Sequence, residues 1–350
     1  MTVNKSGESS FSFNFLPQGQ QLIGILIIAQ ILRIGIHPIG TDWIDWLREA
    51  GNALPNYSSY LSKSVFPSYL ARIIPQNGYV VWWLLFFVLT IIWLFVCLNW
   101  ISKRFQDESF YFQLLFLMFP STSLLLLYVG HYDFFIFVAS CLIGISSSWK
   151  VNVSSFLFIS MTNPEMGLVI ASNLLLMSGF LRMKRMLFMS TVFFSICILA
   201  IHLETIFFSK TRPDRIEINR ELALPTLKTS LPLWQLHFYA QISPILIGIL
   251  CLLFSKLVIR DAFLLIPCFL VPVIFSMIIV DGTRVGASIG TSSLIVCILE
   301  IAKRKEVQKF ESSQEATMLA LWLLIPVLAV DVGGALRLPF EIIINSLING

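Results

Sequence analysis

The sequence predicts an all-α fold, a polytopic bundle of about eleven transmembrane helical segments, and three observations lead to this prediction. Of the 350 residues, 57% are hydrophobic and only 13% are charged, whereas soluble domains carry about 25% charged residues. Apolar runs long enough to cross a bilayer recur along the chain. The short connections between these runs alternate between basic and non-basic, as positive-inside topology requires.

The same composition excludes other classes of protein. A water-soluble fold of this size has no means of hiding so much apolar surface, to which phenylalanine alone contributes 30 residues. The net charge of +4 is spread over apolar segments, so we expect neither a nucleic-acid partner nor a disordered chain. The six cysteines lie singly in apolar runs, which favours buried thiols over disulfides or a zinc site.

The polar segment 1–19 lacks the basic region, apolar core and cleavage site of a signal peptide. We therefore expect a cytoplasmic N-terminal segment over 1–19, a transmembrane domain over 20–332 and a short C-terminal segment over 333–350. A span needs about 20 apolar residues. The expected helical segments are 20–37, 79–101, 109–129, 134–149, 151–163, 165–181, 186–204, 240–258, 262–280, 286–302 and 317–332.

The basic residues of the short connections set the orientation of these segments. With a cytoplasmic N-terminus and eleven crossings, all of them fall on the cytoplasmic side. They are Lys103, Arg104, Lys150, Arg182, Lys184, Arg185, Lys256, Arg260, Lys303, Arg304 and Lys305. We therefore expect a multi-pass protein of the cell (inner) membrane, with the long loops 38–78 and 205–239 outside. The loop 205–239 is expected either to form a wall of a site or to be a plain exposed excursion.

Unusual polar residues gather at the expected outer ends of the helices. Asp42 and Asp45 in TDWIDW are three residues apart, so in a helix they share a face. They are the acidic edge of an interfacial amphipathic helix, or else a general base and a site for a divalent cation such as Mg or Mn. His131 and Asp133 lie in the hairpin tip GHYD, either as an ordinary polar tip or as part of a site.

Two further polar motifs complete the set of candidate residues. In TNPE, Pro164 starts a helix whose dipole Glu165 would complement. A charged residue at membrane depth, beside Asn163, is nevertheless a functional hypothesis. In DGTR, Asp281 and Arg284 either form a local ion pair that caps a turn, or present a guanidinium fork to a phosphate.

The motifs together resemble one family. TDWIDW, followed by Tyr57, Tyr60, Pro67 and Tyr69, resembles the first luminal loop of the GT-C superfamily of integral-membrane glycosyltransferases, especially the glycosylphosphatidylinositol mannosyltransferases. The acidic pair is spaced DWID, where that family has DxD. GHYDFFIFVAS resembles the second motif of many bacterial members, TNPEMGLVIASNLLLMSG their Asn/Lys-Pro helix start, and DGTRVGAS their late outer loop. The resemblance covers about residues 20–300.

The resemblance implies a hexosyltransferase of cell-envelope glycan synthesis that uses a polyprenyl-phosphate-sugar donor and a glycan or glycolipid acceptor on the non-cytoplasmic face. Such a reaction needs a base for the acceptor hydroxyl and donors for the departing phosphate. Asp42 is the expected base, with Asp45 supporting it or sharing a metal. Arg284 and His131 are expected to meet the phosphate.

Asp133, Asn163 and Glu165 are expected to shape the sugar pocket, and Asp281 to orient Arg284. The alternatives are a lipid-linked oligosaccharide polymerase or flippase, a secondary transporter and a non-catalytic assembly subunit. The membrane lipids are partners in every case. A polymerase usually needs larger basic outer loops, and a transporter needs ionisable residues at mid-helix depth, for which only Arg33 and Glu165 qualify.

Overall fold

The fold is all-α over the residues that the computed structural model describes: 18–52, 65–75, 78–106, 109–180, 182–207, 215–238, 240–241, 270–279, 282–304, 312–324, 329–330 and 336–337. The helices are α1 (Gln18–Ile34), α2 (Thr41–Asn52), α3 (Val65–Ile73), α4 (Tyr79–Phe105), α5 (Ser109–Leu117), α6 (Pro120–Leu127), α7 (Asp133–Ile145), α8 (Trp149–Thr162), α9 (Pro164–Phe180), α10 (Lys184–Phe207), α11 (Arg215–Ser230), η3 (Leu231–Leu233), α14 (Gly282–Arg304) and α15 (Ser312–Leu324). The two-residue strands β1 (Ala329–Val330) and β2 (Leu336–Arg337) pair antiparallel.

The expected helix break at TNPE is present between α8 and α9. Asn163 ends α8, and Pro164 begins α9. The side-chain oxygen of Asn163 accepts a hydrogen bond from the backbone N–H of Met166 at 3.0 Å, which satisfies one of the first-turn donors of α9. Asparagine at this position therefore caps the helix that proline starts, and the local sequence is sufficient to produce the break.

The expected single helix over 109–129 is instead two helices, α5 and α6, which are bent by 54° at their junction. Pro120 has no N–H and disfavours a helical residue before it, and Phe119 is accordingly extended with φ −59° and ψ 136°. The carbonyls released at the break find other donors. Thr122 donates to Phe119 O at 2.7 Å, and the Gln30 amide of α1 donates to Leu117 O at 2.9 Å.

The two long connections expected on the outer side contain helices of their own. Residues 38–78 hold α2 and α3, and residues 205–239 hold α11, η3 and a helical turn over 234–238. The two helices α2 and α3 pack very closely. A Cβ atom on Gly51 of α2 would lie 2.2 Å from the backbone oxygen of Ser68 on α3. Only glycine permits that approach.

Within the described residues, two helices are both long and apolar enough to cross a membrane: α4 and the part of α10 over Lys184–Leu203. The bent pair α5 and α6 would make a third if it is taken as one span. Shorter apolar helices occur in α1, α7 and α15. The expected segments 240–258 and 262–280 lie largely outside the described residues, so the number of about eleven spans stays a prediction, as does the placement of the N-terminus.

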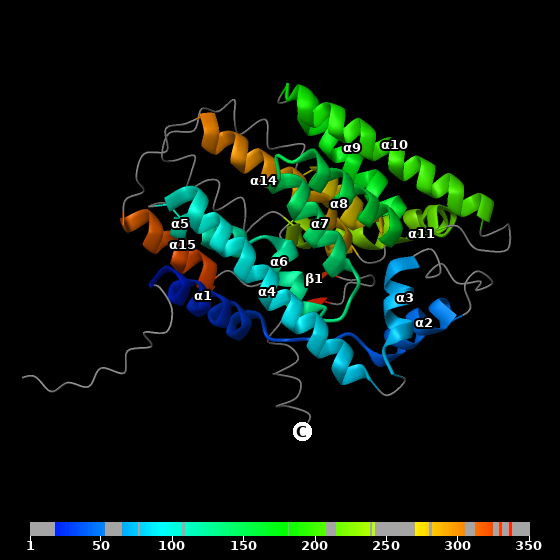
Figure 1. Cartoon of the computed structure of the whole chain (residues 1–350), viewed down its shortest axis with the longest axis horizontal. Helices are drawn as coiled ribbons and strands as arrows, with labels where there is room; N and C mark the ends of the chain where they lie inside the picture. The colour runs from blue at the N-terminus through cyan, green and yellow to red at the C-terminus, as the bar shows by residue number, and fades with distance from the viewer. Residues whose placement is uncertain are drawn as a thin grey trace, which may run out of the picture.

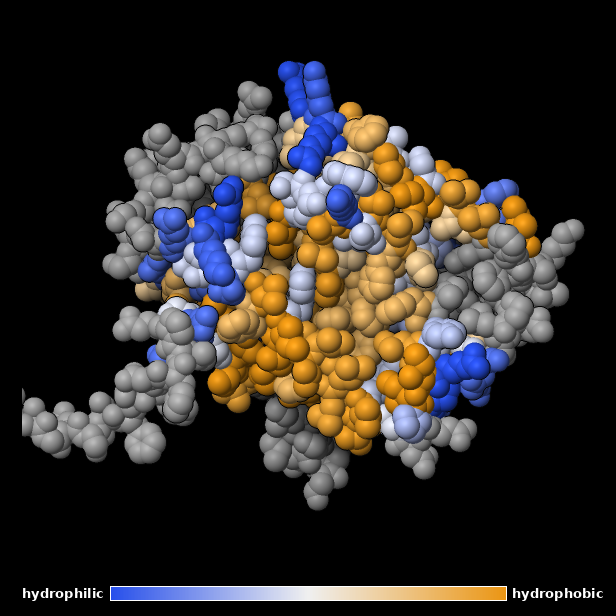
Figure 2. Space-filling view, viewed as in Figure 1, coloured by the Kyte–Doolittle hydropathy of each residue, from blue (hydrophilic) through white to orange (hydrophobic). Residues whose placement is uncertain are grey.

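Apolar and polar surfaces are segregated on the face shown in Figure 2. An apolar band crosses the middle of this face, while hydrophilic side chains gather at its upper and left edges and near α2 at the lower right. Helix α4 also carries exposed apolar side chains, among them Leu84, Val88 and Ile92. Such an exposed band is typical of a membrane-embedded surface, which agrees with a membrane location.

Helices α7, α9 and α14 begin at the same end of the bundle (Figure 1). Residues 133 and 144 of α7 lie beside residues 284 and 295 of α14, so these two helices are parallel and level. Short turns join α7 to α8 and α8 to α9. Phe156 and Phe193 stack and Ser160 meets Cys197, so α8 runs parallel to α10.

Gly167, near the start of α9, lies against the same Cys197, whereas the end of α9 turns directly into the start of α10. Helix α9 is therefore antiparallel to α8 and α10, and parallel to α7 and α14. Asn173 of α9 donates to Ser293 Oγ of α14 at 2.9 Å, which keeps the two helices in contact. The first turns of α7, α9 and α14 carry Asp133, Glu165 and Arg284, and these three residues consequently share one end of the molecule.

Candidate functional site

A buried cluster of three polar side chains joins the first turns of α7 and α14. Arg284 Nε lies 2.6 Å from Asp133 Oδ2, and Arg284 Nη1 lies 2.9 Å from His131 Nε2. His131 Nδ1 lies 3.3 Å from the same carboxylate oxygen, so each of the three side chains contacts the other two. The side chains are 12% exposed for Arg284, 7% for Asp133 and 4% for His131. The structure thus brings together three of the residues that the sequence singled out.

The hydrogen-bonding chemistry of the cluster indicates a neutral His131. A guanidinium only donates, so Nε2 accepts from Arg284 and the ring proton resides on Nδ1, facing Asp133. The backbone N–H of Asp133 also lies 3.2 Å from Nδ1. If Nδ1 accepted that hydrogen bond, the ring proton of the neutral imidazole would be on Nε2 and would face the guanidinium of Arg284, which cannot accept it. The contact between Nε2 and the Arg284 guanidinium is charge-assisted and is shorter than the contact between Nδ1 and the backbone N–H, so it is the stronger of the two. Arg284 and Asp133 then carry the two opposite charges of the cluster.

The hairpin tip that presents His131 is held by the segment between α1 and α2. Val129 N–H donates to His37 O, and Ile39 N–H donates to Val129 O, each at 3.0 Å. Gly130 has φ +98°, and a Cβ there would meet the ring of Trp82 at 3.0 Å. This left-handed residue needs glycine, and Trp82 Nε1 donates to its carbonyl at 2.8 Å. The tip is therefore rigid.

Helix α2 covers the cluster through Trp43. Its ring stacks on His131, with centroids 5.3 Å apart and planes at 26°, and on Tyr132, with centroids 6.2 Å apart. Tyr128 packs against Arg284, whose Cζ lies 5.8 Å from the centroid of the tyrosine ring. No sequence signal linked these aromatic residues to the cluster, since the contacts are between distant segments.

The two carboxylates of α2 have separate environments. Asp45 Oδ1 accepts from Arg48 Nη1 of the same helix at 2.7 Å, and Oδ2 accepts from the hydroxyl of Tyr79 at 2.8 Å, which joins α2 to α4. Asp42 lies in the first turn of α2, next to Trp43, and is exposed. Among the described residues, no three His, Cys, Asp or Glu side chains are grouped to hold a metal ion. Cation binding at Asp42 and Asp45 stays a prediction.

The remaining expected site residues differ in what the structure says of them. Glu165 begins α9 at the same end as the cluster, and both of its carboxylate oxygens are buried. Asn163 serves as the cap of α9 described above. Asp281 lies outside the described residues, so its expected pairing with Arg284 is untested. Asp133 is the carboxylate that holds Arg284 in the described part of the chain.

A cavity of about 240 Å³ adjoins the cluster. Its polar lining is Thr90, Tyr128, His131, Asp133 and Arg284, and the apolar side chains of its wall come from α4, α6 and α7. An enclosed guanidinium beside an apolar wall is suited to an anionic group attached to a hydrocarbon. The cavity therefore places a buried guanidinium next to apolar side chains.

The buried pair His237 and Ser276 is another polar contact that sequence reasoning missed. His237 Nδ1 lies 3.2 Å from Ser276 Oγ, and Ser276 donates its proton to Val273 O at 2.8 Å. The serine oxygen therefore accepts from the imidazole. Burial lowers the pKa of His237 below its usual value of 6.5, because the charged form loses hydration.

The expected thiol chemistry can also be compared with the structure. Cys97, Cys141 and Cys197 are free and buried, as the sequence predicted for the cysteines of apolar runs. Cys251 and Cys268 lie outside the described residues, and Cys297 lies in α14. Comparisons with protein-family models, with curated proteins and with solved structures find no match to this chain.

Proposed function

We propose that this protein is a membrane glycosyltransferase that moves a sugar from a polyprenyl-phosphate donor to a glycan or glycolipid acceptor on the non-cytoplasmic face. The observation that carries the proposal is the buried Arg284–Asp133–His131 cluster at the end of the bundle where α7, α9 and α14 begin. A buried charge is costly unless it is paired and hydrogen-bonded. A pre-formed guanidinium of this kind is suited to the charge that develops on a departing phosphate.

We assign the steps of the transfer reaction to these residues as follows. The acceptor oxygen attacks the anomeric carbon, and its proton passes to the carboxylate of Asp42, which is exposed at the start of α2. The bond between the anomeric carbon and the phosphate oxygen breaks, and the polyprenyl phosphate leaves with the electron pair. Asp133 and His131 hold Arg284 in place, so the guanidinium needs little reorganisation as the negative charge on that phosphate grows.

Glu165 begins a helix at the same end, and we assign it with Asn163 to the wall of the sugar site. A divalent cation, Mg or Mn, at Asp42 belongs to the same proposal. Its test is transfer before and after treatment with EDTA, followed by back-titration with each metal.

The decisive experiment is Asp42→Asn in membranes supplied with a labelled polyprenyl-phosphate sugar. Asparagine keeps the size of the side chain but has no basicity, so transfer should fall by at least about 100-fold. Glu49→Gln is the matched control, because Glu49 is an exposed acidic residue on the same helix. Normal transfer by Asp42→Asn and by Arg284→Lys would remove both residues from the mechanism, and no transfer by the unaltered protein above that of membranes lacking it would refute the glycosyltransferase proposal.

A further inference from the structure

The imidazole of His131 serves the buried cluster in only one of its two ring orientations. A half-turn about the Cβ–Cγ bond exchanges Nε2 with Cε1 and Nδ1 with Cδ2. Carbon atoms would then face Arg284 and Asp133 in place of the two nitrogens. Hydrogen bonds hold the backbone of the hairpin tip at Val129, but they do not fix this side-chain torsion. The geometry of the cluster therefore depends on what stops the ring from turning.

Trp43 supplies the contact that stops this turn. Its ring lies at 26° to the ring of His131, with centroids 5.3 Å apart, so the imidazole can turn only by driving an edge into the indole. Tyr132 adds a third ring, whose centroid is 4.4 Å from that of His131 and 6.2 Å from that of Trp43. Aromatic side chains prefer such offset stacks, and the His131 side chain is 4% exposed. The space for rotation is therefore closed.

The contribution of Trp43 comes from the faces of its ring and not from its polar atom. Trp43 Nε1 is buried and has no hydrogen-bond partner in the part of the chain that the structure describes. A buried indole N–H usually finds a partner, and leaving it unpaired is unfavourable. Stacking is thus what Trp43 offers to the cluster, and we expect another aromatic ring to be able to replace it.

Trp43 also connects the cluster to the start of α2. Asp42 precedes it in the first turn of this helix, so the two residues move together. Asp45, one turn later, joins α2 to α4, whereas the stack on His131 joins the first turn of α2 to the hairpin tip before α7. The position of Asp42 relative to Arg284 therefore depends on Trp43.

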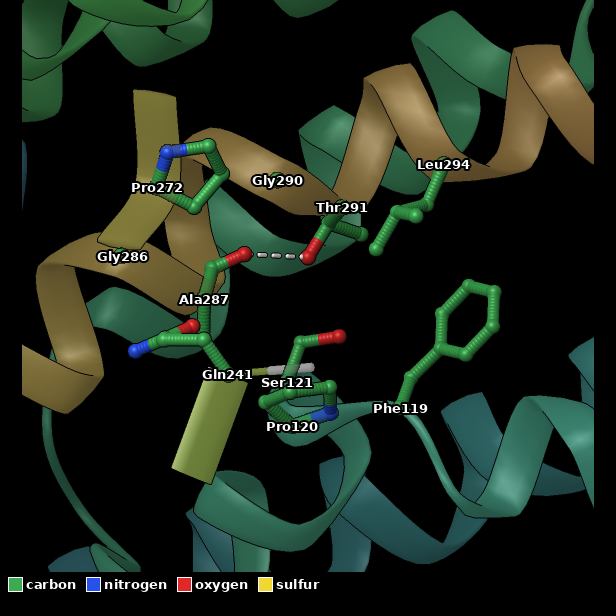
Figure 3. Close-up of a pocket in the computed structure, with 10 residues that line it drawn as sticks. All are labelled: Phe119, Pro120, Ser121, Gln241, Pro272, Gly286, Ala287, Gly290, Thr291 and Leu294. Carbon is green, nitrogen blue, oxygen red and sulfur yellow. Dashed lines mark hydrogen bonds between the residues drawn. The ribbon is translucent and has the colours of Figure 1, made fainter. Parts of the chain in front are cut away.

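Helix α14, which carries Arg284, has little room to follow a displaced imidazole. A Cβ atom on Gly286 would lie 2.6 Å from Gln241 Nε2 and 2.7 Å from the backbone oxygen of Pro272. In Figure 3, Gln241 and Pro272 lie beside the turn of α14 that carries Gly286 and Ala287. The backbone of α14 is therefore closely packed, and it does not compensate for a turned imidazole.

We propose that Trp43 is a positioning residue, whose indole holds the imidazole of His131 with Nε2 toward Arg284 and keeps the first turn of α2 against the cluster. The proposal rests on the function proposed above for the roles of Asp42 and Arg284 in transfer. The orientation of the imidazole, in contrast, is a property of the folded chain, and it can be measured without any reaction.

The first test follows the ring nitrogens of His131 by NMR, on the full chain in detergent with 15N-labelled histidine. The chain has four histidines, and His131→Gln identifies the signals of this one. In the unaltered protein, His131 should show a single form with its proton on Nδ1, because each nitrogen has a fixed neighbour. Trp43→Leu should replace this form by a mixture of tautomers, whereas Trp43→Phe should keep it.

The second test measures sugar transfer by the same variants. Trp43→Leu should lower kcat by about 10- to 100-fold, as misplacement of reacting groups does, with a much smaller change in the KM for the donor. Trp43→Phe should recover most of the lost rate. Trp149→Leu is the matched control, because Trp149 is an exposed tryptophan at the start of α8 and its loss should change neither the NMR signals nor transfer.

Two results would overturn the proposal. One is a single, unchanged form of His131 in folded Trp43→Leu. The other is a loss of that form in Trp43→Phe as complete as in Trp43→Leu, which would show that the stacked ring is not what holds the imidazole. Melting temperatures establish that each variant is folded. If Trp43→Leu does not fold, Trp43→Met takes its place, because methionine is flexible and fills irregular space.

The two measurements separate this proposal from the proposed function. A mixture of His131 tautomers in Trp43→Leu, without sugar transfer by the unaltered protein, would support the positioning role and refute the glycosyltransferase. Sugar transfer by the unaltered protein, with the same kcat and the same His131 signals in Trp43→Leu, would support the enzyme and refute the positioning role.

Discussion

Two carboxylate–guanidinium pairs in this molecule differ in almost every physical respect. Asp45 and Arg48 are three residues apart on α2, and their side chains are 40% and 8% exposed. Asp133 and Arg284 come from α7 and α14, and their side chains are 7% and 12% exposed. The first pair also contacts Tyr79 and the carbonyl of Pro75. The second contacts an imidazole, whose other face is covered by Trp43.

The comparison separates a pair that fastens an outer helix from a pair that is suited to chemistry. The pair on α2 has a partly exposed carboxylate, Asp45, so water and salt screen it in part. A buried pair carries a large desolvation cost that its attraction only partly offsets. Apolar residues would stabilise the contact between α7 and α14 as well or better. The retained charges are therefore a reason to place function at Asp133 and Arg284 rather than at Asp45 and Arg48.

The largest effect should come from Asp133→Asn. This change leaves the guanidinium of Arg284 buried without its counter-charge, so we expect a loss of about 3–5 kcal/mol of stability together with loss of transfer. Thermal unfolding in detergent, followed by intrinsic fluorescence, measures the first effect. A melting temperature equal to that of the unaltered protein would contradict the assignment of this pair as buried.

A double variant sharpens the same comparison. Asp133→Leu combined with Arg284→Met removes both charges, so stability should recover relative to Asp133→Asn. Transfer should stay absent, because no guanidinium remains for the phosphate. Recovery of both stability and transfer would show that the pair has only a structural role.

The next largest effect should come from Arg284→Lys. A single ammonium has no fork to meet Asp133 and His131 simultaneously, so we expect roughly a 100-fold loss of transfer with a much smaller loss of stability. The measurement is transfer at saturating and at limiting donor, which separates donor affinity from the chemical step. Unchanged transfer would remove Arg284 from the phosphate site.

A small effect is expected from Asp45→Asn. The aspartate is partly exposed and its pair with Arg48 is local, so the loss of stability should be less than about 1 kcal/mol. Transfer should be retained if Asp42 is the base. An effect on stability as large as that of Asp133→Asn would reverse the contrast drawn between the two pairs.

The smallest effect concerns pH and the buried His237. Its pKa is lowered in the folded chain, so below about pH 6.5 the unfolded chain binds a proton that the folded chain does not. Stability should therefore fall as the pH is lowered through 6.5 and should be flat above it. Melting temperatures between pH 5 and pH 8 measure this, and His237→Gln should reduce the slope. An unchanged slope in that variant would assign the pH dependence to another group.

Much of the helical architecture was predictable because its signals are local. The apolar runs identify α4, α7 and α10 within a few residues of their observed bounds. Proline after asparagine predicts the start of α9, since a missing N–H and a side-chain cap act within one turn. The bend between α5 and α6 is also at a proline, Pro120, but there the freed carbonyl of Leu117 needs Gln30 of another helix. The continuous apolar run over 109–129 therefore led to the prediction of one helix, without the bend.

The sequence by itself determined the membrane-like composition, the helices and the short list of polar residues at their ends. Only the tertiary structure decided which of those residues meet. Arg284 bonds His131 across 153 positions of sequence and pairs with Asp133, while its expected pairing with Asp281 lies outside the described residues. Asp45, expected to support Asp42, is held by Arg48 and Tyr79, contacts that the sequence did not predict. Helix signals depend on neighbours within a few residues, whereas these contacts depend on how α7 and α14 pack, which no local pattern specifies.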